Sequence, residues 1–367
     1  MNEIIHRLSP LPAEAMRNIA AYQDQACSET PRYEPMDKLI AVLERIPALA
    51  ALYEREGFGT DTLVNTLSDV AIWARFHFAQ SGRWGITVTE WLTHHMDGEL
   101  FKLKRLQFIP RVFPYNFRLY RRNRDGVAVA FPEEPIVYRG DGQVSGTNGI
   151  FEDGFTGGRQ ERSVGGRRFA EGVPISPHGH AENRVVRLWL DAEAPDAWTL
   201  ALAKGMPALE LHVPEEPGFT VEACRASLLA IRDFSVRHKD YLYSWIKPDI
   251  PAAGAFPFAA VYISSWLMDR QLENLLPSGS NIPGFLREFY LAPTLSNAEP
   301  AMERVFHDAQ FDPFHPTQEQ TRTGLQRAIA AFMREGGKMR WNTGFIASED
   351  LPFYGTAPYR ERYAQHV

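Results

Sequence analysis

The stretch Phe258–Trp266 has the sequence FAAVYISSW, which is uninterruptedly apolar up to Ile263. A run of this kind is typical of a strand that is buried on both faces of a sheet. Ala208–Val213 (ALELHV) predicts another strand earlier in the chain. Val221–His238 lies between the two and repeats apolar residues every three or four positions, which predicts an amphipathic helix. Strand, helix and strand in this order indicate an α/β domain.

We expect this α/β domain to occupy residues 206–350, with a tail at 351–367. Further elements are predicted after the second strand, namely short helices at Asp269–Leu276 and Ile282–Tyr290, a longer helix at Thr323–Arg334 and a closing strand at Met339–Ile346.

The chain before this domain divides into a helical and a β-rich part. Residues 1–100 are predicted to be helical, with apolar faces along Met36–Arg55 and Thr62–Gln80 and a break at Pro47. Thr87–Glu90 has the pattern of a capping box that opens a short helix. Residues 101–205 predict short strands at Phe101–Lys104, Leu106–Phe108, Tyr115–Tyr120, Val127–Phe131 and Ile136–Tyr138. Gly140–Gly179 is rich in Gly, Ser, Thr, Asp and Arg, which predicts a long functional or mobile loop.

Composition narrows the class of protein. The 367 residues carry 39 Lys and Arg against 45 Asp and Glu, a net charge of −6, which argues against a nucleic-acid partner. Cys27 and Cys224 are too few for a disulfide scaffold or a Cys-based zinc site. No apolar run approaches the about 20 residues that span a membrane, and the start MNEIIHRLSP shows no secretory signal. These features predict a cytoplasmic protein without a membrane partner, and they leave its oligomeric state open.

An ordered set of segments resembles a known family. The set includes LFKLKRLQF (Leu100–Phe108), GDGQVSGTNG (Gly140–Gly149), LELHVP (Leu209–Pro214), SSWLMD (Ser264–Asp269), LPSGSNI (Leu276–Ile282) and TGLQRA (Thr323–Ala328). In this order the segments resemble bacterial acyltransferase-domain proteins that pair N-terminal and C-terminal domains related to GNAT N-acyltransferases. The resemblance implies a GNAT-like α/β domain behind a helical region and a β-rich middle. It also implies transfer of an acyl group from a thioester to an amine, with acyl-CoA as co-substrate, acyl carrier protein as a second form of donor, and no tightly bound cofactor.

Two departures from the family pattern concern the acyl donor. GNAT enzymes bind the pyrophosphate of acyl-CoA with Gln/Arg-x-x-Gly-x-Gly/Ala, and the nearest stretch here is Asn123–Ala128, which precedes a predicted strand. Related chains carry Cys-x-Ser-Trp where this chain has Ile263–Trp266, so no role of that cysteine carries over.

His212 and Glu210 are the leading catalytic candidates. They are two residues apart on the predicted strand ALELHV, so their side chains share one face near its C-terminal end. Acyl transfer to an amine needs a group that takes a proton from the attacking nitrogen, and a neutral histidine or a carboxylate meets that need. The plainer interpretation is a structural histidine beside a surface glutamate.

Ser265 is the third catalytic candidate. Ser264 and Ser265 end the second strand just before Trp266, and a hydroxyl there could protonate the departing thiolate or act as a nucleophile with His212 as base. The chain has no Gly-x-Ser-x-Gly elbow, and paired serines at a strand end more often cap the following turn.

Polar and cationic segments suggest binding roles. The Gly-rich loop offers Asp141, Gln143, Asn148 and Asp153 to a polar substrate, with Trp266 as a further contact, or uses these residues merely to form turns. Arginines among glycines, and Ser and Asn before a helix, suit the phosphates of an anionic donor, for which the candidates are Arg159, Arg167, Ser280 and Asn281. Solvated charge and simple capping are the alternatives.

A metal site is not expected. His95 and Asp97 form a His-x-Asp pair that His178 or His180 could complete, but the pair ends a predicted helix and not the barrel strand that such iron sites use.

The leading hypothesis is therefore an enzyme, an acyltransferase that moves an acyl group from acyl-CoA to the amine of a small polar molecule. The alternatives are a serine-dependent hydrolase or amide-forming enzyme on a GNAT-like frame, and a non-catalytic protein that binds a metabolite.

Overall fold

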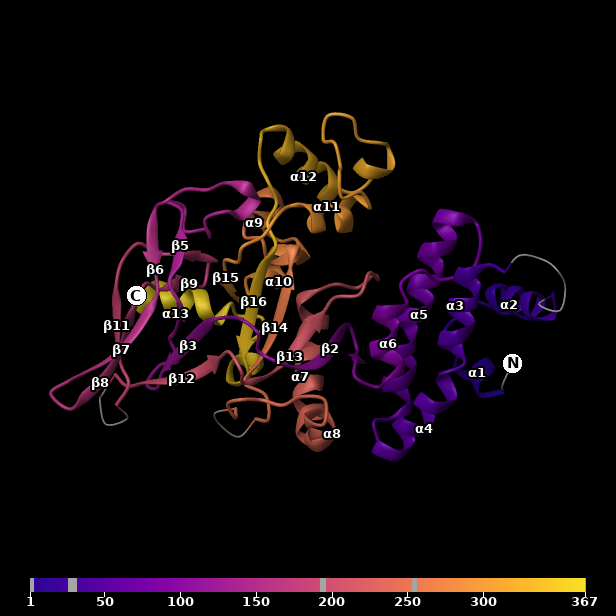
Figure 1. Cartoon of the computed structure of the whole chain (residues 1–367), viewed down its shortest axis with the longest axis horizontal. Helices are drawn as coiled ribbons and strands as arrows, with labels where there is room; N and C mark the ends of the chain where they lie inside the picture. The colour runs from indigo at the N-terminus through magenta and orange to yellow at the C-terminus, as the bar shows by residue number, and fades with distance from the viewer. Residues whose placement is uncertain (1–2, 26–31, 192–195, 253–255, 367) are drawn as a thin grey trace. The chain divides into compact units, whose positions relative to one another are not determined.

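The computed structural model describes residues 3–25, 32–191, 196–252 and 256–366 (Figure 1). Cys27 lies outside these ranges. The chain divides into two compact units. Unit 1 comprises Met1–Arg111, Glu210–Phe219 and Ala226–Lys247, and unit 2 comprises Val112–Leu209, Thr220–Arg225 and Pro248–Val367. The predicted division of the sequence at residues 100, 205 and 350 stays a prediction.

In its described residues, unit 1 begins with six helices, namely α1 (Glu3–Leu8), α2 (Ala13–Gln25), α3 (Glu34–Leu43), α4 (Ile46–Glu56), α5 (Thr60–Ser81) and α6 (Thr89–Met96). The break predicted at Pro47 is confirmed, because this proline lies in the first turn of α4, where its missing N–H costs nothing. The capping box predicted at Thr87 is wrong. The residue that precedes α6 is Val88, and no side chain caps the helix.

Unit 1 is completed by a short hairpin, by parts of one later strand and one later helix, and by a short helix that follows them. β1 (Phe101–Leu103) pairs antiparallel with β2 (Leu106–Val112). β13 (Pro207–His212) and α7 (Val221–Arg237) each contribute residues to both units, and α8 (Lys239–Tyr243) belongs to unit 1. The core is aromatic, since the Phe58 ring lies 5.0 Å from Phe101, and Phe101 lies 4.8 Å from Phe234 of α7.

Unit 2 is built on antiparallel strands. β14 (Ala260–Ser265), β16 (Asn342–Ala347) and β15 (Tyr290–Ala292) lie in this order, and β14 is buried as far as Ile263, as its apolar run predicts. A five-stranded sheet has the order β10 (His180–Ala181), β9 (Ile175–Ser176), β4 (Ala128–Pro132), β3 (Phe117–Arg122) and β12 (Trp198–Ala203). Buried Tyr290 links the two groups of strands, because its hydroxyl donates to the Ile175 carbonyl and accepts the Ala130 N–H at 2.9 Å.

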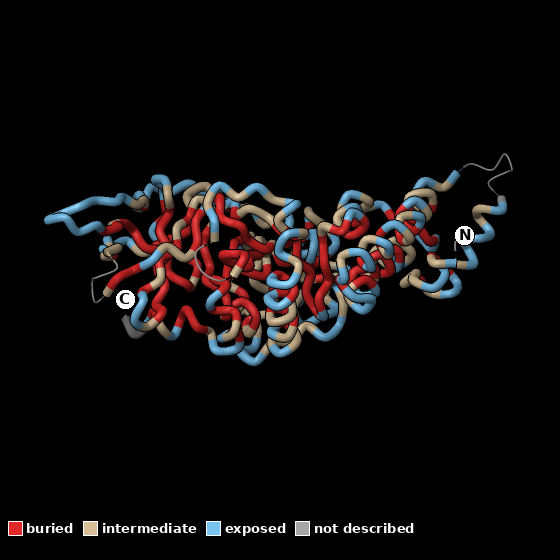
Figure 2. Tube along the Cα trace, turned by 90° about the horizontal axis from the view of Figure 1, so that it is seen from below, coloured by how far each residue is buried: buried red, intermediate tan, exposed pale blue. Residues whose placement is uncertain are grey.

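The predicted loop at Gly140–Gly179 contains strands and was in that respect wrong. β5 (Ile136–Tyr138) pairs with β6 (Phe155–Gly157), and β7 (Arg159–Val164), β8 (Arg167–Gly172) and β11 (Val186–Trp189) form a separate sheet. The β7–β8 hairpin is exposed along most of its length, as Figure 2 shows. Because much of this hairpin faces solvent, its sequence lacks the apolar alternation that predicts a strand.

The C-terminal helices are shorter than predicted in two places. α9 is limited to Leu272–Leu275, and α10 (Asn281–Leu286) ends before Tyr290, which opens β15. The remaining helices are α11 (Glu299–Phe306), α12 (Gly324–Arg334) and α13 (Pro358–His366). α12 begins with a capping box between Thr323 and Gln326. The predicted α+β class, with a helical N-terminal region and mixed strands and helices behind it, is confirmed. Among the described helices, none combines the length and apolarity that crossing a bilayer requires.

Candidate functional site

His212 and Glu210 lie side by side on β13. The Nε2 atom of His212 is 3.5 Å from Glu210 Oε1, and both side chains are partly exposed, at 31% and 26%. Within the described part of the chain, the buried Nε2 atom makes no hydrogen bond. The arrangement places a partly exposed imidazole beside one carboxylate.

Arg111 of β2 forms an ion pair with the second carboxylate oxygen of Glu210. Its Nε atom is 3.4 Å from Glu210 Oε2, and its Nη1 atom also bonds Glu99. Burial alone would raise the pKa of Glu210, but its contact with His212 and the nearby charges of His212 and Arg111 lower it below the ordinary value. Glu210 therefore stays ionised at neutral pH and is a poor proton acceptor itself.

The Trp91 indole packs against the His212 ring. The ring centroids are 4.7 Å apart and the planes meet at 60°. Trp91 comes from α6, and its own position is fixed by a hydrogen bond of 2.7 Å from Nε1 to Asp69 Oδ2 on α5. The edge-on contact restricts the orientation of the imidazole, since aromatic pairs of this geometry attract each other.

Asp69 is a buried anchor that sequence reasoning missed. It receives a second indole N–H from Trp73 at 3.3 Å and lies 3.3 Å from Nε2 of fully buried His95. Burial would raise the pKa of Asp69, but the hydrogen bond and charge of His95 and the Trp91 N–H lower it. The sequence signal was the four-residue spacing of Asp69 to Trp73 and of Trp91 to His95, which places each pair on one helix face.

The His-x-Asp pair considered as a metal ligand set does not converge. His95 turns inward, where Nδ1 is 3.2 Å from the Trp91 carbonyl and Nε2 is 3.3 Å from the Gln107 amide nitrogen. Asp97 instead bonds Arg45. Within residues 3–25, 32–191, 196–252 and 256–366, no three His, Cys, Asp or Glu side chains are grouped so that they could hold a metal ion.

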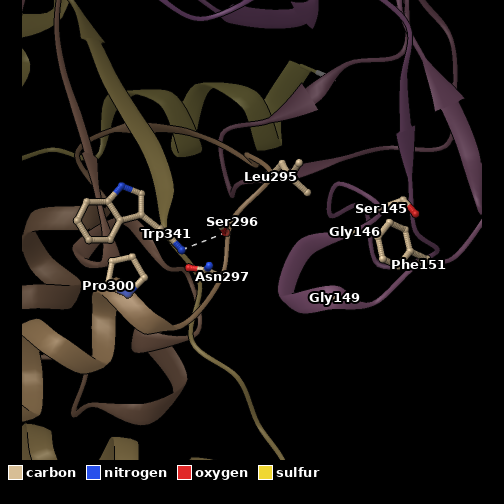
Figure 3. A pocket seen from close by; sticks show the side chains of 9 residues that line it. All are labelled: Ser145, Gly146, Gly149, Phe151, Leu295, Ser296, Asn297, Pro300 and Trp341. Atoms are coloured by element: carbon tan, nitrogen blue, oxygen red, sulfur yellow. Dashed lines mark hydrogen bonds between the residues drawn. The ribbon is translucent and has the colours of Figure 1, made fainter. Parts of the chain in front are cut away.

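Unit 2 contains an open pocket beside the Gly-rich loop, with a volume of 640 Å³. Figure 3 shows the residues around it, which are Ser145, Gly146, Gly149, Phe151, Leu295, Ser296, Asn297, Pro300 and Trp341. The loop is anchored at Asn148, whose N–H donates to the Ser296 carbonyl at 2.8 Å and whose side chain donates to the Met339 carbonyl at 3.0 Å. Trp341 is held by a 2.8 Å bond from its Nε1 to Ser264 Oγ.

The predicted substrate-binding residues have different surroundings. Asp141 forms ion pairs with Arg139 and Arg340, and buried Gln143 donates to the Gly179 carbonyl, so both hold the loop in place. Asp153 is exposed, and Trp266 begins a short 3₁₀ turn after β14.

Ser265 caps this 3₁₀ turn, since its Oγ accepts the Leu267 N–H at 3.2 Å. Ser264 and Ser265 belong to unit 2, whereas His212 and Glu210 belong to unit 1.

The residues considered for an anionic donor are mostly engaged elsewhere. Arg159 pairs with Glu133 and Glu161, and Arg167 lies 4.4 Å above the Trp189 ring. Ser280 precedes α10 without a side-chain cap bond, and Asn281 is exposed.

The Asn123–Ala128 stretch is a turn between two strands. Asp125 in this turn pairs with Arg122, and Gly126 has a φ of +72°. No helix N-terminus follows it, so this stretch lacks the geometry of a phosphate-binding loop.

Comparison with protein families gives two matches. A GNAT-like C-terminal domain matches residues 100–346, and an N-acyltransferase N-terminal domain matches residues 3–98. Curated proteins gave no match.

Solved structures with a similar fold are acyltransferases. One in complex with decanoyl-CoA is 17% identical, with 94% of this chain and 86% of that chain covered and a TM-score of 0.54. One in complex with CoA and 10C-teicoplanin is also 17% identical, with 94% and 93% covered and a TM-score of 0.50. A third, a mutant in complex with octanoyl-CoA, is 20% identical with a TM-score of 0.49, and it covers 84% of this chain. The present chain spans 65% of the length of that third protein.

Proposed function

This chain belongs to the family with a GNAT-like C-terminal domain, and we propose that it transfers an acyl group from acyl-CoA to the amine of a small polar acceptor. The choice of acyl-CoA over an acyl carrier protein is supported by the acyltransferases of similar fold that were solved with decanoyl-CoA and with CoA. The second of these structures also contains 10C-teicoplanin.

The observation that carries this proposal is the His212–Glu210 pair. In acyl transfer the amine nitrogen attacks the thioester carbonyl, the C–N bond forms, the C–S bond breaks and the nitrogen loses a proton. A half-exposed imidazole can take that proton, and an ionised carboxylate 3.5 Å away stabilises the imidazolium that results. We assign His212 as the base and Glu210 as the group that orients the imidazole and stabilises its protonated form.

Ser265 is proposed as the proton donor to the departing thiolate, and its hydroxyl regains a proton from solvent as the thiol leaves. Its oxygen accepts the Leu267 N–H, an interaction that leaves the hydroxyl hydrogen free to be donated. The acceptor is proposed to bind at the Gly-rich loop, with Asn148, Asp153 and Trp266 as the polar and aromatic contacts that the sequence suggested. The phosphates of the donor are proposed to meet Ser280, Asn281, Arg159 and Arg167.

The direct test is calorimetry of the full chain with CoA, acetyl-CoA and decanoyl-CoA, followed by measurement of free thiol released in the presence of amines. We expect binding of at least one thioester and amine-dependent release of CoA with a matching amide product. Absence of binding by all three compounds, with no thiol release, would overturn the donor assignment. Thiol release without amide would point to a hydrolase.

A further inference from the structure

The pocket in unit 2 has an exposed apolar mouth. Phe151 and Leu295 are 82% and 68% exposed, although both are large apolar side chains. They meet over Gly146, because a Cβ atom at that position would lie 3.1 Å from Phe151 Cε1 and 3.2 Å from Leu295 Cδ1. Gly146 has a φ of +95°, which also favours glycine, so both the backbone and the two side chains that pack over it favour a residue without a side chain at this position. The volume of 640 Å³ falls within the range of small-molecule sites.

Trp341 forms a fixed apolar wall of the same pocket. Its Nε1 donates to Ser264 Oγ at 2.8 Å, and its backbone N–H donates to Ser296 Oγ at 3.2 Å. Figure 3 shows the indole on one side of the pocket and Phe151 on the other. An apolar group that enters between them would be desolvated on two sides, and burial of apolar surface is the main source of affinity in such sites.

A lysine lies beside the loop that lines the pocket. Lys338 Nζ donates to the carbonyl of Asn148 at 3.3 Å, and Asn148 lies between the lining residues Gly146 and Gly149. In the described ranges of the chain, no carboxylate pairs with Lys338. Two further cations already have acidic partners, because Arg139 and Arg340 lie 2.7 and 3.3 Å from Asp141, and Asp269 Oδ2 accepts the Arg340 N–H at 2.8 Å. Lys338 is therefore the cation of this group that is available to an anionic part of a ligand.

We propose that this pocket binds an amine that also carries a carboxylate and an apolar group, the chemistry of an apolar amino acid. The apolar group packs against Phe151, Leu295 and Trp341, and Lys338 holds the carboxylate at the rim. The apolar group and the carboxylate of this ligand are inferred from the pocket alone. The amine, as the nitrogen that receives the acyl group, rests on the proposed function.

The test is calorimetry of the full chain with three probes and no acyl-CoA. L-phenylalanine carries both recognised groups, L-phenylalaninamide lacks the carboxylate, and glycine lacks the apolar group. We expect phenylalanine to bind, and the other two to bind at least about tenfold more weakly, since each loses one recognised group. If phenylalanine does not bind, or if it binds no better than its amide, the proposal fails.

Two matched pairs of variants locate the binding. Phe151→Ala should weaken phenylalanine binding about tenfold, whereas Phe314→Ala, at a phenylalanine that is also exposed but does not line the pocket, should not. Lys338→Gln should bring the affinities for phenylalanine and its amide close together, and Lys204→Gln, at another exposed lysine of unit 2, should leave them apart. Equal effects within either pair would overturn the assignment of the pocket.

Failure of this inference is distinguishable from failure of the proposed function. If phenylalanine binds as described but the protein acylates no amine, the proposed function fails and the ligand class of the pocket stands. If the protein acylates amino acids with the same KM in the Phe151→Ala and Phe314→Ala variants, the proposed function stands and the pocket assignment fails.

Discussion

Trp91 donates its indole N–H to the buried carboxylate of Asp69 at 2.7 Å. The same indole lies edge-on to the His212 ring, with centroids 4.7 Å apart. Trp91, which contacts the proposed base, is thus held in place by a hydrogen bond to the buried Asp69. This bond is charge-assisted and therefore stronger than a neutral one. The relationship makes Trp91 a positioning residue, because it acts on the reaction through His212.

Replacing Trp91 by Phe keeps an aromatic ring near His212 but removes the bond to Asp69. We expect kcat to fall about tenfold, because a base that is free to turn spends less time aligned, while KM for acyl-CoA stays close to that of the wild type. Steady-state kinetics with both substrates measures the split.

Trp73→Phe is the matched control. Trp73 also donates to Asp69, at 3.3 Å, but does not contact His212. Both variants should lose stability, and only Trp91→Phe should lose kcat. Equal losses of kcat would mean that Asp69 acts through the stability of unit 1 alone.

Replacement of His212 by Gln tests the base directly. Glutamine retains a polar side chain but cannot take a proton near neutral pH, so kcat should fall by at least about 10²-fold. His315→Gln serves as control, because His315 forms a His–Asp pair with Asp312 at 2.7 Å but is 84% exposed and belongs to unit 2. Wild-type rates in the His212 variant would reject the assignment.

Glu210 and Arg111 should move the pH profile of kcat/KM in opposite directions. Glu210→Gln removes the carboxylate that stabilises the imidazolium, so the acid limb of the profile should shift to lower pH. Arg111→Gln removes the cation that opposes the imidazolium, so the acid limb should shift to higher pH. Rates measured from pH 5 to 9 at low substrate give both limbs. Shifts in the same direction would contradict the electrostatic role given to this pair.

The sequence predicts the strands of the core better than the site. The apolar runs of β13 and β14 are sufficient to predict these strands, because burial favours apolar residues along them. That His212 and Glu210 share one face is predicted by the alternation of side chains along β13. The exposed β7–β8 hairpin is missed since its polar residues carry no periodic signal. Asp69 and Trp91 are 22 residues apart on different helices, and only the packing of α5 against α6 brings them together.

Acid should destabilise the protein partly through Asp69. Its pKa is lowered in the folded state, so its contribution to stability is complete above the unfolded value of about 3.9 and is lost as pH falls through the folded value. Asp69→Asn should therefore lower the free energy of unfolding by about 3 kcal/mol at pH 7, and by progressively less as the pH falls from 4 toward 2. Urea unfolding at both pH values checks this, with exposed Asp153→Asn as control. A loss that is independent of pH would mean that packing, and not charge, accounts for the effect.

Gly98, which follows α6, should not tolerate a side chain. Its φ is +78°, and a Cβ atom would lie 2.4 Å from Leu52 Cδ2 and 2.7 Å from Tyr241 Oη. Gly57 has a similar φ of +70° but nothing within 4 Å of its Cβ position. Gly57→Ala should cost about 1 kcal/mol of backbone strain, and Gly98→Ala should cost about 1–3 kcal/mol more through overpacking. Denaturant unfolding of both variants isolates the packing cost, because the strain is common to them. Equal losses would show that Leu52 and Tyr241 move aside freely, and the segment that leads from α6 to Glu99 would then be less rigid than its contacts indicate.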